Sequence, residues 1–189
     1  MRFAIKKVIT FFGAAILVLG IAHAQSLAFK SIELLNKDKN WVLASKISLE
    51  LNPTLEQFVK KGLTLYFVAD FQLSKSRWYW FDEKIVEHSR VMKITYHALT
   101  NQYRVTLDGL SVVAPSLKDA LTVVGTIEDW PVIEQAQVVD GQVYQAALRI
   151  RLDTNQFAKP LQVNALNSKS LNMQSDWRRF EFVPKKVAP

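Results

Sequence analysis

The chain has 189 residues, of which 49% are hydrophobic and 22% are charged, with 24 Lys and Arg against 17 Asp and Glu. These values fit a globular domain and exclude a disordered tail, a collagen-like repeat and a polytopic membrane protein. The sequence contains no cysteine, which excludes disulfide scaffolds, thiol catalysis, iron–sulfur clusters and cysteine-based zinc sites.

The first 24 residues have the pattern of a secretory signal peptide. Three basic residues lie among the first seven, residues 8–22 form an uncharged apolar run, and Ala22-His23-Ala24 is a small-x-small cleavage pattern. The run is shorter than the ~20 residues of a membrane-spanning helix, although an uncleaved N-terminal anchor is the alternative. We therefore expect cleavage after Ala24 and a periplasmic protein of residues 25–189, with no stable membrane span after cleavage.

Export also narrows the class of partner. Cleavage would remove three basic and no acidic residues, so the formal charge would fall from +7 to +4. A modest positive charge is typical of an ordinary solvated surface, and we expect no nucleic-acid partner.

Alternation of apolar and polar residues dominates the rest of the sequence. A period of two runs through residues 41–51 (with Ser45 as the exception), 63–73, 92–97, 103–108 and 144–153. This period predicts strands with one face in a core and one in water, and therefore antiparallel sheets. Turn residues predict hairpins at Thr100-Asn101 and Asp140-Gly141, and a turn at Ser74–Ser76 into a strand over residues 77–81.

Start and stop signals predict two short helices. The first has Asn52 as a good N-cap, Pro53 at its first position and Gly62 after its last turn. The second begins with Ser116 and Asp119, which resemble a capping box, and ends at Gly125.

The predicted elements belong to one domain. No stretch of residues 25–189 resembles an interdomain linker, and residues 183–189 are expected to form a frayed tail. We predict a mainly β fold, with β-sandwich-like antiparallel sheets and two short α-helices.

Signatures of nucleotide-binding and hydrolytic enzymes are absent. The sequence has no GxxxxGK[ST], GxGxxG or GxSxG pattern, and its histidines lack metal-ligand spacing. Asp82, Asp153 and His97 are the candidate acids or bases of an unrecognised hydrolase of envelope polymers, but no spacing pairs them. We predict no catalytic residue, no metal and no cofactor.

The most distinctive local sequence is RWYWFD at residues 77–82. On a strand it would carry aromatic rings on both faces, and rings beside an arginine can hold a sugar, a peptide or a partner's loop. The alternative is a central or helix-covered strand whose rings only pack the fold. The candidate ligand- or partner-binding residues here are Arg77, Trp78, Tyr79, Trp80 and Asp82.

A second candidate is a pair of arginines on one strand face. Arg149 and Arg151 stand with Asp153 opposite the apolar row of residues 144–152. Guanidinium groups at this spacing can bind a carboxylate or phosphate, but they can equally form cross-strand ion pairs. The motifs Asp129-Trp130 and Asp176–Arg179 also combine tryptophan with charge, and edge packing is the simpler interpretation of both.

Several pieces of the chain together resemble a known family. They are LEQFVKKGLTL (55–65), RWYW (77–80) followed by Asp82, YHALTNQYR (96–104), SLKDAL (116–121), LRIRLD (148–153), KPLQ (159–162) and SDW (175–177). The chain is similar to exported proteobacterial proteins of the domain-of-unknown-function 4390 family. The resemblance implies secretion, one domain per chain and genes often found beside a membrane sensor kinase and its response regulator. Members commonly have a proline-rich stretch, which this chain lacks, and the family supplies no established activity or site residue.

These observations favour an exported envelope binding or signalling accessory of unknown ligand, working with a membrane or periplasmic protein, for which a membrane sensor kinase system is one candidate. An alternative is an envelope assembly or structural factor that offers a sheet edge to a partner's strand. A long, uncharged and unprotected edge strand would distinguish that alternative. A hydrolase is the third hypothesis, and it requires a cleft that gathers two of its candidate residues.

Overall fold

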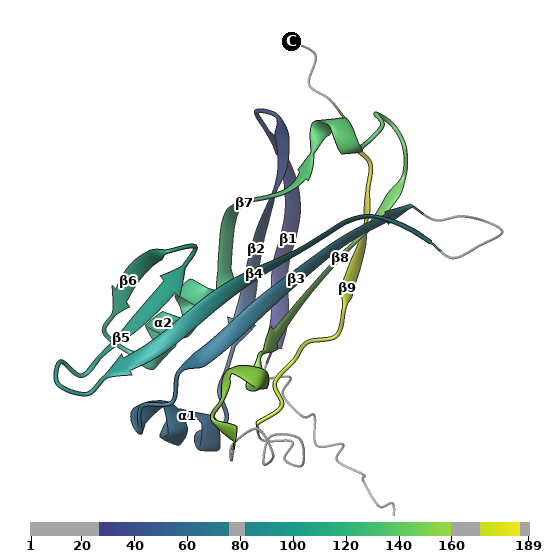
Figure 1. Ribbon diagram of the computed structural model, residues 1–189. Coiled ribbons are helices and arrows are strands. Elements are labelled where there is room, and N and C mark those ends of the chain that lie inside the picture. Colours follow the sequence, from purple (N-terminus) through teal and green to yellow (C-terminus); the bar gives the residue numbers. More distant parts are fainter. Residues whose placement is uncertain (1–26, 76–81, 160–170, 186–189) are drawn as a thin grey trace, which may run out of the picture.

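The computed structural model describes residues 27–75, 82–159 and 171–185, which form two antiparallel sheets facing each other across one core (Figure 1). The three-stranded sheet has the order β1 (Leu27–Lys37), β2 (Asn40–Leu49), β7 (Thr126–Glu134). The six-stranded sheet has the order β6 (Leu110–Ala114), β5 (Gln102–Leu107), β4 (Glu83–His97), β3 (Leu65–Lys75), β8 (Tyr144–Leu152), β9 (Arg178–Phe182).

Two short helices complete the fold, together with the 3-10 turns η1 (Gln135–Gln137) and η2 (Thr154–Gln156). Helix α1 (Pro53–Lys60) joins β2 to β3, and helix α2 (Leu117–Gly125) joins β6 to β7. This architecture confirms the predicted mainly β fold with two short helices. No helix in the described ranges has the length and hydrophobicity needed to cross a membrane.

The apolar rows predicted from the period of two line the core. In β3 the row is completely buried, and it consists of Leu65, Phe67, Ala69, Phe71 and Leu73. The exception in β2, Ser45, is also buried, at 2% exposure. Its hydroxyl donates a hydrogen bond of 2.8 Å to the carbonyl oxygen of Ser31, beside a bulge in β1. A buried hydroxyl that finds a carbonyl in this way avoids the cost of an unpaired polar group.

Both helices begin at the predicted caps. The Asn52 side chain accepts a hydrogen bond from the Leu55 N–H (3.0 Å), and the Ser116 hydroxyl accepts one from the Asp119 N–H (3.1 Å). Gly62 follows α1 with a φ of 94°, as a left-handed helix end requires. Gly125 serves another purpose, because a β-carbon there would collide with the carbonyl oxygen of Ile47 in β2.

The hairpin predicted at Asp140-Gly141 is wrong. The strands on either side of it, β7 and β8, belong to different sheets, so the chain crosses the sandwich at this point. Gly141 does turn the chain, with a φ of 72°, and its N–H donates to the carbonyl oxygen of Pro184 (3.0 Å). Pro184 is buried, so the described start of the expected tail packs on the domain.

Other local predictions have mixed outcomes. The turn at Thr100-Asn101 is confirmed, since β4 ends at His97 and β5 begins at Gln102. The turn predicted from Ser74 is wrong, because β3 continues through Lys75 and pairs there with Glu83 of β4. The signal peptide and the strand over residues 77–81 lie outside the described residues. The sequence did not predict β1, β6, β7, β9 or the first half of β4.

Candidate functional site

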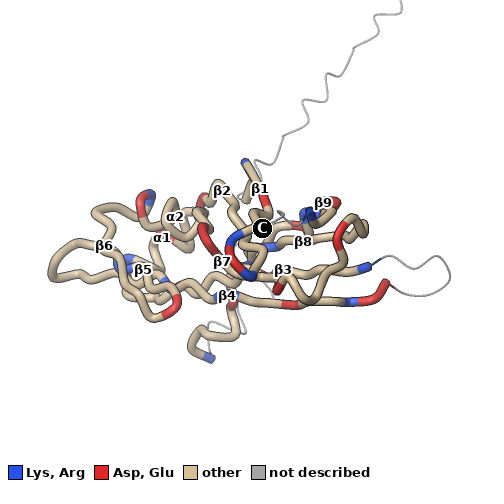
Figure 2. Tube along the Cα trace, turned by 90° about the horizontal axis from the view of Figure 1, so that it is seen from above, with Lys and Arg blue, Asp and Glu red and all other residues tan. Residues whose placement is uncertain are grey.

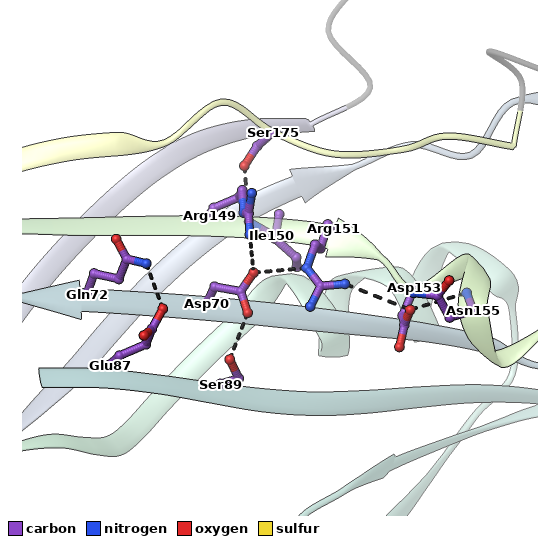
Figure 3. A network of polar contacts seen from close by, with 10 residues as sticks. All are labelled: Asp70, Gln72, Glu87, Ser89, Arg149, Ile150, Arg151, Asp153, Asn155 and Ser175. Atoms are coloured by element: carbon purple, nitrogen blue, oxygen red, sulfur yellow. Dashed lines mark hydrogen bonds and ion pairs between the residues drawn. The ribbon is translucent and has the colours of Figure 1, made fainter. Parts of the chain in front are cut away.

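A buried aspartate organises the outer face of the six-stranded sheet (Figure 3). Asp70 of β3 is 7% exposed and lies directly opposite Arg149 of β8. One carboxylate oxygen, Oδ2, accepts hydrogen bonds from Arg149 Nη2 at 2.7 Å and Arg151 Nε at 2.9 Å. The other, Oδ1, accepts one from the hydroxyl of Ser89 on β4, at 2.8 Å. Three neighbouring strands are therefore joined through one carboxylate.

Opposing effects act on the pKa of Asp70. Burial by itself raises the pKa, because it penalises the charged form. Hydrogen bonds from Arg149, Ser89 and Arg151 together outweigh burial, and they hold the pKa below its ordinary value of 3.8. Asp70 is therefore a carboxylate at neutral pH, and its charge is matched by the arginines above it.

The two arginines are largely committed to this network. Arg151 also lies 3.8 Å from the carboxylate of Asp153, so the cluster contains two positive and two negative groups. The side chains of Arg149 and Arg151 remain 28% and 31% exposed, although Nε of Arg149 is buried without a hydrogen-bond partner among the described residues. Their first role is to neutralise Asp70. The charges of the cluster already cancel, so it offers little net attraction to an added anion.

Arg149 also anchors the segment that leads into β9. Its guanidinium lies 4.5 Å from the centroid of the Trp177 ring, a cation–π contact. Two further hydrogen bonds fix this segment to β8: the Ser175 N–H donates to the Ile150 carbonyl oxygen (2.8 Å), and the Ile150 N–H donates to the Ser175 hydroxyl (3.0 Å). Residues 174–178 are thus held firmly along β8.

The same segment forms one end of a long groove between β1 and β9, which we call the β1–β9 seam. Three adjoining hollows follow it. The first, of about 480 Å³, lies between Leu27–Phe29 and residues 174–178. The second, of about 210 Å³, shares Phe29 and Arg178 with the first. The third, of about 420 Å³, shares Ile32 and Phe180 with the second and continues to Lys185. Neighbouring hollows share lining residues, so the three follow one another along the seam.

The floor of the seam is apolar and only partly covered. Phe29, Ile32 and Leu34 of β1 and Phe180 of β9 pack against the core but remain partly exposed. At one end the Trp41 and Phe182 rings meet edge to face, with centroids 5.0 Å apart. Basic residues, Lys30 and Arg178, line the middle hollow, whereas Glu33 and Glu181 line the third.

Both walls of the seam are strand edges. Among the described residues, β1 pairs only with β2, and β9 pairs only with β8. Viewed from above, β1 and β9 lie on the same side of the sandwich (Figure 2). In an antiparallel pair every second residue of an edge strand turns its N–H and C=O away from its neighbour, so both walls present backbone hydrogen-bonding groups.

A larger hollow, of about 840 Å³, lies between the end of β2 and the two helices. Its charged lining residues are of both signs: Lys30, Lys46, Lys60 and Lys118 with Glu50 and Glu56. The lysines are exposed, so this hollow has no buried charge that would orient a ligand.

Among the predicted site residues that the structure describes, only the two arginines share a partner. Arg149 and Arg151 meet at Asp70, while Arg77, Trp78, Tyr79 and Trp80 lie outside the described residues. Asp82 is exposed just before β4, and His97 ends that strand of 15 residues, so these two hydrolase candidates lie at opposite ends of it. No group of three or more potential metal ligands gathers within the described ranges.

Two elements of the site escaped prediction from sequence. Asp70 is the only acidic residue in β3, where it interrupts an otherwise uncharged strand as far as Ser74, and this could have marked it as a partner for the arginines. The seam had no comparable signal, because neither of its walls was predicted to be a strand.

The described residues define an antiparallel β-sandwich with a groove along one side. The sequence profile of the family described as Domain of unknown function (DUF4390) matches residues 24–181, and the chain belongs to this family. The match confirms the resemblance found in the separate sequence pieces. No curated protein and no solved structure gives a significant match to the chain.

Proposed function

We propose that the protein is an exported binding module of the bacterial envelope, which holds an extended segment of a partner protein in the β1–β9 seam. The observation that carries this proposal is the seam itself, a row of three adjoining hollows with an apolar floor and two strand edges as walls.

The walls favour a polypeptide as the occupant. An extended chain can hydrogen-bond to an unpaired strand edge along its whole length, which an acyl chain cannot do. The β1 wall has 11 residues, so it is roughly 35 Å long. A strand of matching length would close the sandwich along this side and cover the exposed parts of the floor.

The lining residues predict the character of that segment. Partly exposed side chains such as Ile32 and Phe180 favour apolar residues at every second position, where a strand directs alternate side chains to the floor. Lys30 and Arg178 favour an acidic residue near the middle of the groove. The Arg149–Trp177 contact supports binding indirectly, because it fixes the segment at one end of the groove.

The envelope location rests on the signal-peptide pattern of residues 1–24. A membrane sensor kinase is a reasonable first partner to test, given the gene neighbourhood that the family resemblance implies. The proposal unites binding and strand addition: the protein acts as an accessory, and the seam is where it engages its partner.

Site-specific photo-crosslinking in the native envelope tests the proposal. A photoreactive residue replaces Ile32 on the seam floor or, as control, Leu35 on the outward face of the same strand, which is 48% exposed. We expect crosslinks to one defined peptide segment from Ile32 and none to that segment from Leu35. Equal crosslinking at both positions, or none at Ile32, would contradict the proposal.

The crosslinked segment is then synthesised and its affinity for the purified protein measured. Ile32→Glu should weaken binding about tenfold, since it removes an apolar side chain from the floor and its carboxylate competes with the partner's acidic residue for Lys30 and Arg178. Leu35→Glu should leave the affinity within about twofold. Circular dichroism establishes that both variants are folded. Unchanged affinity in folded Ile32→Glu would overturn the seam as the binding site.

A further inference from the structure

A second strand edge, on the opposite side of the six-stranded sheet from the seam, differs from the other three. Natural sheets protect their edges with charges, prolines and bulges. β1 has a bulge and charged residues, β7 contains Pro131 and an Asp129 with a φ of 49°, and β9 contains two arginines and a glutamate. β6 has the sequence LSVVA, with no such feature, and it is tan along its length in Figure 2.

The edge of β6 is also exposed. Leu110, Val112 and Val113 are 76%, 50% and 54% exposed, and β6 pairs only with β5 among the described residues. Asp108 and Gly109 form a tight turn between β5 and β6, both with positive φ, as a two-residue hairpin requires. The hairpin is therefore well defined, and its outer edge presents apolar side chains together with backbone groups.

We propose that β6 pairs with β6 of a second copy of this chain, in an antiparallel arrangement centred on Val112. In this register Val112 faces itself across the two-fold axis, Leu110 faces Ala114, and Ser111 faces Val113. A large residue then meets a smaller one at each end, and no charged residue lies opposite another in the paired strands. The two six-stranded sheets would become one continuous sheet.

Charge complementarity beyond the strand supports a second copy as the occupant. The register brings the turn that carries Asp108 beside residues 115 and 116 of the other copy, at the N-terminal end of its α2. Asp108 already pairs with Arg90 of its own chain through Oδ2, but its side chain is 54% exposed, and the N-terminus of α2 already has Asp119 bonded to the Ser116 hydroxyl. The exposed Lys118 in the first turn of α2 is therefore the group of the second copy that can approach the open side of the Asp108 carboxylate. Two-fold symmetry forms this contact twice. The pairing leaves the seam unobstructed, because β9 is at the opposite edge of the sheet.

A contact between two strands of five residues is small, so the dimer should be weak and reversible. We expect sedimentation equilibrium of the purified mature protein to show a monomer–dimer equilibrium below about 1 mM. Val112→Lys places two positive charges opposite each other at the two-fold axis and should weaken the dimer at least about tenfold, as should Val112→Glu. An equimolar mixture of these two variants should form a heterodimer. Leu35→Lys, at an apolar site of similar exposure, is the matched control and should dimerise like the unchanged protein.

Disulfide trapping gives an independent test, because the natural chain contains no cysteine. Paired residues on antiparallel strands have Cα atoms about 4.5–5.5 Å apart, within the range of a disulfide. Val112→Cys should form a covalent dimer on mild oxidation much faster than Leu35→Cys. A protein that is monomeric throughout this concentration range, a dimer unaffected by Val112→Lys, or equal trapping of the two cysteine variants would each overturn the proposal.

Discussion

The two sides of the β-sandwich, where the edges of the two sheets face each other, differ in how they are covered. On the side of β6 and β7, helix α2 packs against strands of both sheets, and Arg90 of β4 reaches across to the Trp130 ring of β7, 5.5 Å from its centroid. On the side of β1 and β9, Phe29, Ile32 and Phe180 remain partly exposed in the seam. Aromatic and aliphatic residues are present on both sides. Helix α2 covers those on one side, which belong to the core, whereas those in the seam stay partly exposed and form a candidate binding surface.

Topology accounts for this difference. β6 and β7 are consecutive strands, and the chain that joins them is α2, which covers the gap between the sheets. β1 and β9 are the first and last described strands, so no single connection joins one directly to the other. A sandwich whose terminal strands meet at one side needs another element to close it, and our proposal is that a partner supplies that element.

The largest expected effect on stability is the loss of an aromatic side chain from the covered side, compared with the same kind of loss from the seam. Trp130→Ala should lower the free energy of unfolding by about 3–5 kcal/mol, since Trp130 is 7% exposed and Arg90 packs on it. Phe29→Ala in the seam should cost less, about 2 kcal/mol, because its ring packs against the core but is only partly buried. Urea denaturation measures both, and equal costs would show that the seam is as structural as the closed side.

The next effect concerns how closely α2 approaches the three-stranded sheet. Gly125→Ala should cost about 3 kcal/mol or more, because its β-carbon would meet the backbone of Ile47, which cannot move without disturbing β2. Gly141→Ala is the matched control: nothing lies within 4 Å of a β-carbon there, and only its φ of 72° is unfavourable, at about 1–2 kcal/mol. A smaller cost at Gly125 than at Gly141 would contradict tight packing of α2.

The contrast between the sides also explains what the sequence could predict. Strands β2 and β3 and both helices follow from the local period and the caps. β1 was missed because its bulge moves the inward row from Leu27 and Phe29 to Ile32 and Leu34, which destroys the period of two. β9 has only five residues, three of them charged. Since both walls of the seam lacked a local signal, the groove could not be predicted.

The arginine pair shows a different limit of local reasoning. The spacing of Arg149 and Arg151 on one strand face was recognised, together with the alternative of cross-strand ion pairs. Their partner Asp70 lies 79 residues from Arg149 in sequence, and only the register of β3 on β8 reveals it. An alternating pattern predicts on which face of a sheet a residue lies, but it does not predict which strand lies beside it.

The next prediction concerns Asp70, which lies on the outer face of the six-stranded sheet. Its network should make the free energy of unfolding depend on pH. Because its folded-state pKa is below 3.8, Asp70 contributes stability that is complete above its unfolded-state pKa and is lost as the pH falls through the folded-state value. Asp70→Asn should cost about 2 kcal/mol at pH 7, since it leaves two arginines without their carboxylate.

The variant should also lose less stability than the unchanged protein as the pH falls below about 4, the ordinary pKa of an aspartate, because it has no carboxylate at this position to take up a proton. Urea denaturation across this range measures the difference. Parallel stability curves for the two proteins would show that the Asp70 network does not contribute to acid sensitivity.

The smallest effects concern the helix caps, and they test whether α2 alone is the cover of the closed side. Ser116→Ala and Asn52→Ala each remove one capping hydrogen bond and should each cost about 1 kcal/mol. Hydrogen exchange should separate them: amides of β7 should exchange faster in Ser116→Ala, because its lost cap loosens the helix that packs on that strand, and not in Asn52→Ala. Ser116→Thr, which keeps the hydroxyl that accepts from the Asp119 N–H and donates to its carboxylate, should restore slow exchange. Faster exchange of the β7 amides in both alanine variants would mean that these amides become exposed only when the whole domain opens. Helix α2 would then not open independently of the rest of the fold.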